Sequence, residues 1–259
     1  MIRNAPSLSS VAGRAGAFLL TVAAGLVAFS GSAMADDAFL AKVDEAVNKW
    51  KTLDYTYDIV TETKGDADKA KLKLRMRMKD AGKHNTQIVE ISAPADMKGT
   101  KVLTISPTEM YIYLPAMRKV RRIASHVTEA GFLGTALSQK DLTLTRYGDK
   151  YKVEKTEEKG DRTIMLLVAK GDAAPYPKIR MTVATKQLLP TAFEYMNEQG
   201  KVIKTEKRSQ YRCEKDYCTP GVQEVDDVAN GKKTTLSLKD YKINPNLDDS
   251  IFSKRSLLK

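Results

Sequence analysis

Histidine and cysteine are scarce in this chain, with two of each among its 259 residues. The histidines, His84 and His126, stand in unrelated contexts, and the metal-binding spacings HxxH, HExxH and CxxC are missing. The GxGxxG, P-loop and GxSxG motifs are missing as well, and neither Ser125 nor Ser138 has an evident base. We therefore expect no metal site, no cofactor and no enzymatic activity.

The two cysteines, Cys213 and Cys218, lie between two runs with strand character. No other cysteine or histidine accompanies them, which argues against a metal site. In an oxidising compartment this spacing is typical of a disulfide across the end of a hairpin. A loop this small contributes roughly 2 kcal/mol in the chain-entropy model. We predict a Cys213–Cys218 disulfide whose role is structural.

Long hydrophobic runs are also rare, and the one present covers residues 15–29. Arg3 and Arg14 give it a basic start, and Ala33-Met34-Ala35 follows as a small-x-small cleavage site. We predict a secretory signal peptide over residues 1–35, cleaved after Ala35, and one periplasmic domain over residues 36–259. An N-terminal membrane anchor is the alternative. No run in residues 36–259 approaches the length of a membrane span.

Positive charge exceeds negative charge: 43 Lys and Arg against 32 Asp and Glu give a net charge of +11. A basic exported protein favours anionic lipid headgroups or an acidic partner, although solubility explains the charge equally well. We expect no nucleic-acid partner, because the chain carries an export signal and does not interleave aromatic residues with its basic strand.

The clearest periodic signal is KLKLRMRMK at residues 71–79. Its apolar residues alternate with five cations, so in a strand they share one face. An antiparallel sheet allows one face to be buried and the other solvated. The pattern predicts that the inner face carries Leu72, Leu74, Met76 and Met78. Ordinary core packing remains the alternative to ligand contact for each of them.

Similar alternation, separated by turn signals, continues to about residue 241 and indicates about eleven strands. An amphipathic helix is predicted before them, over residues 39–53, where apolar residues recur at spacings of three and four. No internal repeat or composition shift marks a second domain. A mainly β fold follows: a single antiparallel sheet curled into a half-open barrel, with an N-terminal helix.

The stretch from residue 109 to residue 142 has the most unusual pattern. Tyr111 and Tyr113 alternate in a strand and are predicted to line the same inner face. A cluster of cations follows a proline, and an apolar pair then stands between Gly131 and Gly134. The cations are Arg118, Lys119, Arg121 and Arg122. The apolar pair, Phe132 and Leu133, would be exposed unless it covers a pocket.

This stretch resembles the signature of the LolA-like outer-membrane lipoprotein-sorting proteins, in its runs YIYLPAMRKVRRI and GFLGTALSQKDL. The first run matches at Tyr113, Pro115, Arg118, Lys119, Val120, Arg121, Arg122 and Ile123. The second matches at Phe132, Gly134, Thr135, Leu137, Ser138, Asp141 and Leu142. The resemblance implies a half-open barrel with a helical or loop lid over a hydrophobic cavity.

We accordingly expect a monomeric periplasmic carrier that shields the acyl chains of lipoproteins or other lipids during transfer toward the outer membrane. Its partners would be an inner-membrane transporter and an outer-membrane acceptor. The lid would consist of Phe132, Leu133 and Gly134. The four cations would form a basic rim for headgroups or an acidic partner, or else a solvated edge that deters sheet aggregation. The alternative function is a non-carrier module that docks a transporter complex or an envelope polymer.

Overall fold

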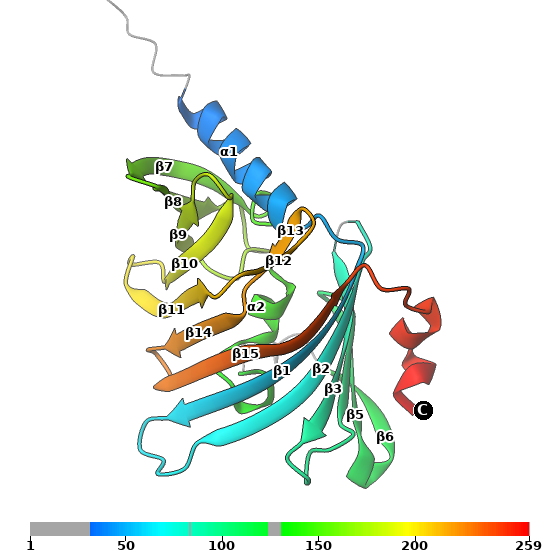
Figure 1. Ribbon diagram of the computed structural model, residues 1–259. Helices are drawn as coiled ribbons and strands as arrows, with labels where there is room; N and C mark the ends of the chain where they lie inside the picture. Colours follow the sequence, from blue (N-terminus) through cyan, green and yellow to red (C-terminus); the bar gives the residue numbers. More distant parts are fainter. Residues whose placement is uncertain (1–31, 83, 124–130, 259) are drawn as a thin grey trace, which may run out of the picture.

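The computed structural model describes residues 32–82, 84–123 and 131–258. A single antiparallel sheet of thirteen strands dominates it, and the two edge strands, β6 and β7, are not joined (Figure 1). The order across the sheet is β6-β5-β4-β3-β2-β1-β15-β14-β11-β10-β9-β8-β7. The mainly β, half-open architecture expected from the sequence is therefore confirmed.

The strands of this sheet are β1 (Thr52–Thr63), β2 (Ala70–Asp80), β3 (Asn85–Ala93), β4 (Lys101–Ser106), β5 (Glu109–Leu114), β6 (Lys119–Ile123), β7 (Tyr151–Lys159), β8 (Arg162–Ala169), β9 (Lys178–Ala184), β10 (Leu189–Met196), β11 (Val202–Ser209), β14 (Val222–Asp227) and β15 (Lys232–Ile243). The two short strands β12 (Arg212–Glu214) and β13 (Tyr217–Thr219) pair separately. The expected number of about eleven strands is thus too low. The main sheet alone has thirteen strands. The short strands β12 and β13 have three residues each, which is too few to show a period in the sequence.

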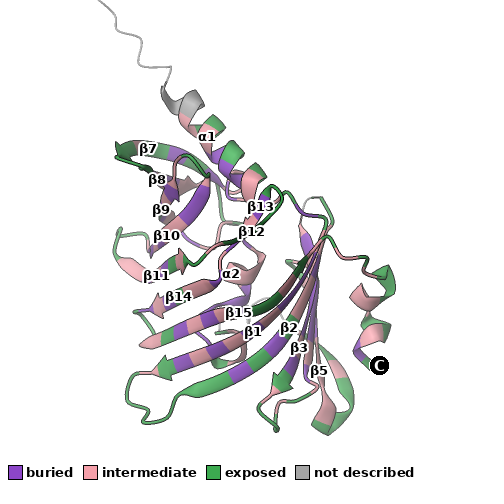
Figure 2. Ribbon diagram, in the orientation of Figure 1, coloured by how far each residue is buried: buried purple, intermediate pink, exposed green. Residues whose placement is uncertain are grey.

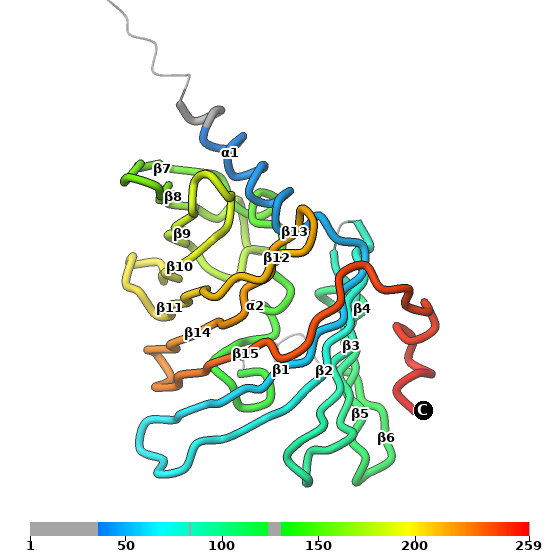
Figure 3. Tube along the Cα trace, in the orientation of Figure 1, coloured from blue at the N-terminus to red at the C-terminus, as the bar shows by residue number. Residues whose placement is uncertain are grey.

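The chain path places the first and last strands together at the middle of the sheet. From β1, the strands β2 to β6 follow outward in chain order on one side. The strand β15 returns to pair with β1, in a register that joins Leu53 to Ile243 and Thr63 to Lys232. Figure 3 shows this pair along the trace, between the two halves of the molecule. The sheet is therefore held together at its centre by residues distant in sequence.

The N-terminal helix α1 covers Ser32–Val47 rather than the predicted residues 39–53. After the helix, the Trp50 indole N–H donates to the Val47 carbonyl at 3.2 Å, and β1 begins at Thr52. Leu40 and Val43 are fully buried and pack α1 onto the β7–β10 half of the sheet. The predicted signal peptide lies mostly in residues 1–31, outside the described residues.

Alternation gives the sheet two different faces, visible as colour changes along β1, β2 and β15 in Figure 2. The inner face of β1 to β5 carries the main core, which includes Leu72, Val89 and Val102. The outer face of β3 to β6 is covered by two C-terminal 3-10 helices, η4 (Asp249–Phe252) and η5 (Lys254–Leu258). The C-terminus therefore covers part of the outer face of the sheet, and the open concavity lies on the inner face.

The connection between β6 and β7 enters this concavity (Figure 1). Its described part begins at residue 131 and contains the 3-10 helix η3 (Phe132–Gly134) and the short helix α2 (Gln139–Thr143). Ser138 caps α2: its hydroxyl accepts from the Asp141 amide, and the Asp141 carboxylate accepts from the Ser138 amide. A helix inside the barrel mouth matches the expected lid position.

Candidate functional site

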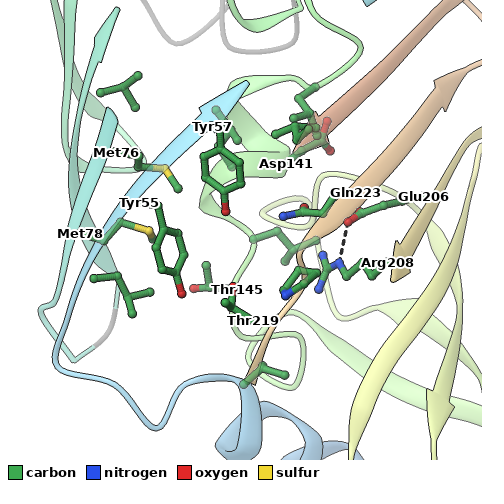
Figure 4. A pocket seen from close by; sticks show the side chains of 18 of the residues that line it. Tyr55, Tyr57, Met76, Met78, Asp141, Thr145, Glu206, Arg208, Thr219 and Gln223 are labelled. Atoms are coloured by element: carbon green, nitrogen blue, oxygen red, sulfur yellow. Dashed lines mark hydrogen bonds and ion pairs between the residues drawn. The ribbon is translucent and has the colours of Figure 1, made fainter. Parts of the chain in front are cut away.

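A cavity of about 210 Å³ lies between the concave face of the sheet and the β6–β7 connection. Strands from both halves of the sheet contribute to it, together with the end of α1 and the β12–β13 hairpin. Figure 4 shows Met76 and Met78 on one side, and Glu206 and Arg208 on the other. The pocket therefore has two chemically distinct walls.

The apolar wall comes from β1, β2 and β3 and consists of Leu53, Ile59, Leu74, Met76, Met78 and Val89. These side chains share a face because the register sets Met76 opposite Tyr55 on β1 and Val89 on β3. Leu74 and Met78 are buried, whereas Met76 is partly exposed. Leu72 packs in the same core but does not line the pocket. Three of the four apolar residues predicted on β2 thus lie at the cavity.

Tyr111 and Tyr113 lie elsewhere, and their predicted place on the inner face is wrong. Both pack in a separate cluster on the outer face, where Leu257 of η5 is fully buried. The Lys254 ammonium lies 4.2 Å from the centre of the Tyr111 ring. On β5 it is Ile112 that packs against the inner core. The alternation was correct, but the sequence pattern did not reveal that the C-terminal helices cover the outer face.

Of the three residues predicted to form a lid, one lines the cavity. Phe132 lines the cavity, and its amide donates to the Leu137 carbonyl at 2.5 Å. Leu133 packs against the inner core with φ 51°, a left-handed conformation that is uncommon for leucine. Gly134 follows at φ 83°, which glycine adopts without strain. Further cover comes from α2 and the residues around it, with Leu137 and Leu142 lining the pocket.

A buried ion pair fixes α2 to the opposite half of the sheet. Asp141 accepts from the Lys204 ammonium of β11 at 2.8 Å, with both side chains less than a tenth exposed. Its second oxygen accepts from the Tyr176 hydroxyl at 2.5 Å. Burial, and then Asp141, raises the pKa of Tyr176 well above its ordinary value, so this hydroxyl remains a donor. Ser138 and Asp141 of the family-like run therefore anchor the cover over the pocket.

The polar wall consists of Tyr195, Glu206, Arg208, Tyr211, Tyr217 and Gln223. Glu206 accepts from Arg208 Nε at 2.6 Å and from the Tyr195 hydroxyl at 2.7 Å. Burial acts to lower the pKa of Arg208, but Glu206 and the neighbouring tyrosines raise it well above its ordinary value. Burial also raises the pKa of Tyr211 to about 12. This wall thus offers a permanent cation and neutral hydroxyl groups.

Sequence reasoning missed this wall. Lys204, Glu206 and Arg208 occupy alternate positions of β11 and point inward, while Thr205 and Lys207 lie between them. Both faces of the strand are polar, so alternation of apolar and polar residues gives no signal. The available signal was that three charged residues share one face of a strand predicted to lie inside a sheet.

The predicted disulfide between Cys213 and Cys218 is present, with an S–S distance of 2.04 Å across the β12–β13 hairpin. Cys218 also lines the pocket. The next residue inward, Tyr217, shares a hydrogen bond with Tyr55 of β1, their hydroxyl oxygens being 3.2 Å apart. The hairpin is therefore part of the pocket wall as well as a covalent staple.

The four cations of the predicted rim are all exposed, on the edge strand β6 and the turn before it. They do not form a single patch: Arg121 is paired with Ile112, on the inner side, and Arg122 with Tyr111, on the outer side. None of them lines the pocket. Residues 124–130, including Ser125 and His126, lie outside the described residues.

The basic face of β2 is largely neutralised by acids on β1, β3 and the C-terminal helix η4. Arg75 makes two hydrogen bonds to Asp54 of β1, at 2.8 and 2.6 Å. Arg77 lies 3.5 Å from Glu90 of β3, and Lys73 and Lys79 also meet carboxylates. This pairing leaves little free positive charge to attract a polyanion. Within the described ranges there is also no cluster of three metal-ligating residues, and no helix is long and apolar enough to cross a membrane.

Comparison with solved structures identifies the fold as LolA-like. A Vibrio parahaemolyticus domain assigned as an outer membrane lipoprotein-sorting protein superposes with a TM-score of 0.77 at 20% identity, covering 88% of this chain and 100% of the other. A DUF1329 family protein from Desulfovibrio piger also gives 0.77 at 20% identity, covering 87% and 98%. A LolA superfamily protein from Nitrosomonas europaea gives 0.69 at 18% identity, covering 85% and 98%.

At the level of sequence, a family model described as "-like: Uncharacterized protein" matches residues 83–259, and the chain belongs to that family. The comparison with curated proteins yields no match. The matched region begins between β2 and β3 and includes the whole β6–β7 connection, the polar wall and the disulfide hairpin.

Proposed function

We propose that this protein is a periplasmic carrier that binds an acyl chain of a lipoprotein or another lipid and shields it from water. The observation that carries this proposal is the apolar wall of β1 to β3 facing Phe132 and Leu142 across one cavity. Such a surface suits a ligand with few directional contacts. The LolA-like fold, shared with a domain assigned to lipoprotein sorting, supports the same conclusion.

The energetic need for such a pocket follows from the hydrophobic effect. Each methylene removed from water contributes about 0.8 kcal/mol, so an exposed acyl chain has a large unfavourable free energy. Met76 and Met78 add flexible, polarisable side chains that adapt to chains of different shape. Non-directional contacts of this kind also allow the acyl chain to be released to an acceptor, because each contact is weak on its own.

The cavity as described is smaller than the roughly 300–1,000 Å³ of typical ligand pockets. A long acyl chain therefore requires the lid to move outward. Two features locate the movement: η3 contains no buried residue, whereas α2 is held by the Asp141–Lys204 pair. We place the opening at η3. The carrier itself performs no bond chemistry, and its partners would be an inner-membrane transporter and an outer-membrane acceptor.

The test uses the protein purified from the periplasm. Native mass spectrometry should detect co-purified lipid, and the delipidated protein should bind a fluorescent acyl probe and extract lipoprotein from donor membranes. If the delipidated protein binds no probe and extracts no lipoprotein, the carrier proposal is wrong and the protein is better described as an interaction module.

A further inference from the structure

The polar wall contains one acid whose two carboxylate oxygens both accept hydrogen bonds, and one cation whose terminal nitrogens meet no carboxylate among the described residues. Glu206 is 5% exposed, and its two carboxylate oxygens accept from Arg208 and Tyr195. Arg208 is 20% exposed and uses only its Nε for this ion pair. Among the described residues, Glu206 is the one carboxylate that Arg208 meets. Its two terminal nitrogens thus have no carboxylate partner.

The guanidinium group of Arg208 is held in a fixed place. Its central carbon lies 4.4 Å from the centre of the Phe193 ring, which stacks on Tyr195 with ring centres 5.9 Å apart. The Tyr147 hydroxyl is a further hydrogen-bonding neighbour. A planar cation fixed in this way loses little conformational freedom when it binds an anion.

A second polar group lies beside it. Gln223 of β14 lines the pocket, and Figure 4 shows it next to Glu206 and Arg208. Its side-chain amide makes no hydrogen bond within the part of the chain that the structure describes. Arginine and glutamine together supply N–H donors on one side of the cavity, opposite Met76 and Met78.

We infer that Arg208 and Gln223 form a subsite for the anionic head of an amphiphilic ligand, a carboxylate or a phosphate, whose acyl chain lies on the apolar wall. This inference rests on the proposed function. Arginine matches both heads because its donors can contact two oxygens at once. A ligand without a polar head would expel water and give the terminal nitrogens of Arg208 no anionic partner, which is unfavourable. The pocket should therefore select amphiphiles over pure hydrocarbons.

The test compares ligands that share one chain and differ in the head. Delipidated protein is titrated at pH 8 with dodecanoate, dodecyl phosphate, dodecanol and dodecyltrimethylammonium. At least one anion should bind about tenfold more tightly than dodecanol, the size expected from a charged hydrogen bond. The tighter anion identifies the preferred head. Equal affinity for both anions and dodecanol would overturn the inference while leaving the carrier proposal intact; failure of all four would overturn both.

Three variants test whether Arg208 is the source of the preference for anions. Arg208→Gln should remove the preference for anions over dodecanol. Arg180→Gln is the matched control, because Arg180 pairs with Glu194 between β9 and β10, is 47% exposed and does not line the pocket. Glu206→Gln should strengthen the preference for anions, because it removes the carboxylate that competes for Arg208. This variant tests the inference if Arg208→Gln does not fold. A loss of affinity for all ligands alike in Arg208→Gln would assign Arg208 a merely structural role.

Discussion

Lys204 donates to Asp141 at 2.8 Å across the barrel mouth, joining β11 to the helix that covers the pocket. The two side chains are 8% and 7% exposed. A buried pair of this kind contributes little net stability compared with apolar replacements, yet either partner alone becomes a buried charge without a counter-ion. It therefore fixes the place of α2 more than it adds to overall stability.

The Asp141–Lys204 pair predicts a strong and asymmetric response to mutation. Asp141→Asn should lower the free energy of unfolding by about 3–5 kcal/mol, because Lys204 stays buried without its carboxylate. The double variant Asp141→Leu with Lys204→Met should recover much of this loss. Urea titration followed by circular dichroism measures all of them. Glu154→Gln, which removes an exposed partner of Lys178, is the control and should cost less than about 1 kcal/mol. An effect of Asp141→Asn no larger than that of the control would show that α2 is held by other contacts.

Asp44 of α1 predicts a specific pH dependence. Burial raises the pKa of its carboxyl from 3.8 to about 6, although it accepts backbone hydrogen bonds from Tyr147 at 3.0 Å and Gly148 at 2.6 Å. The folded state thus favours the protonated form, so the stabilising contribution of Asp44 is greatest below pH 3.8 and is lost as the pH rises through about 6. The difference in free energy of unfolding between wild type and Asp44→Asn should fall by about 3 kcal/mol over this window. Glu45→Gln, at an exposed position of the same helix, should show no such slope. If the difference in free energy of unfolding between wild type and Asp44→Asn does not change with pH, the raised pKa of Asp44 is wrong.

The two apolar residues Phe132 and Leu133 predict a loss of ligand binding when both are replaced by charged residues. Phe132→Asp combined with Leu133→Asp removes one pocket-lining residue and one that packs on the inner core. Affinity for a fluorescent acyl probe should fall by at least about tenfold, because a carboxylate at the cavity disfavours apolar contact. Met117→Asp is the control, because Met117 is 51% exposed and lies away from the pocket. Unchanged affinity in the folded double variant would place the binding site elsewhere.

The two faces of β5 predict that stability and binding can be separated. Leu257→Ala should lower the free energy of unfolding by about 2–5 kcal/mol, because Leu257 is fully buried against the outer face. Tyr111→Ala should act in the same direction. Neither should change affinity for the acyl probe, since neither residue lines the cavity. Met76→Asp should do the reverse, weakening binding with a smaller effect on folding. A binding defect in Tyr111→Ala would show that the outer face communicates with the pocket.

The disulfide predicts a combined effect. Cys213→Ser with Cys218→Ser should lower the free energy of unfolding by roughly 2 kcal/mol, as expected for a small loop. It should also weaken ligand binding, because Cys218 lines the pocket and Tyr217 contacts Tyr55. Thermal unfolding and probe titration measure the two effects. The sequence alone assigned this bridge a purely structural role, so intact binding in the double variant would favour that simpler view.

The sequence predicted the sheet well because period-2 alternation reports local geometry. Residues 71–79 form a strand with Leu74, Met76 and Met78 on the pocket side, as the pattern required. The prediction from sequence failed where the burial of a residue depends on segments distant along the chain. Nothing near Tyr111 indicates that Leu257 covers that face. The polar wall was missed for a related reason: Glu206 and Arg208 of β11 contact Tyr195 and Phe193 of the neighbouring strand β10, and the sequence of β11 alone does not show these partners.

The end of the helix and the grouping of the four cations were also predicted incorrectly from the sequence alone. Apolar periodicity continues past residue 47, but the helix ends there, and the Val47 carbonyl accepts from the Trp50 indole. The cations Arg121 and Arg122 were treated as one group by their closeness in sequence. In a strand, neighbours face opposite sides, so the pairing with Ile112 and Tyr111 separates them.

The pairing of β1 with β15 has a consequence for how the protein reaches its native state. A chain made from its N-terminus has β1 early, but the register from Leu53 to Ile243 requires the last strand. Until then β1 and β14 present two open edges, and the halves of the molecule have no shared ladder. Contacts so distant in sequence make folding slow, and unpaired edges invite association with other chains. Assembly should therefore be completed only after the whole chain has emerged, and a truncation before residue 232 should leave two half-sheets that cannot enclose a pocket.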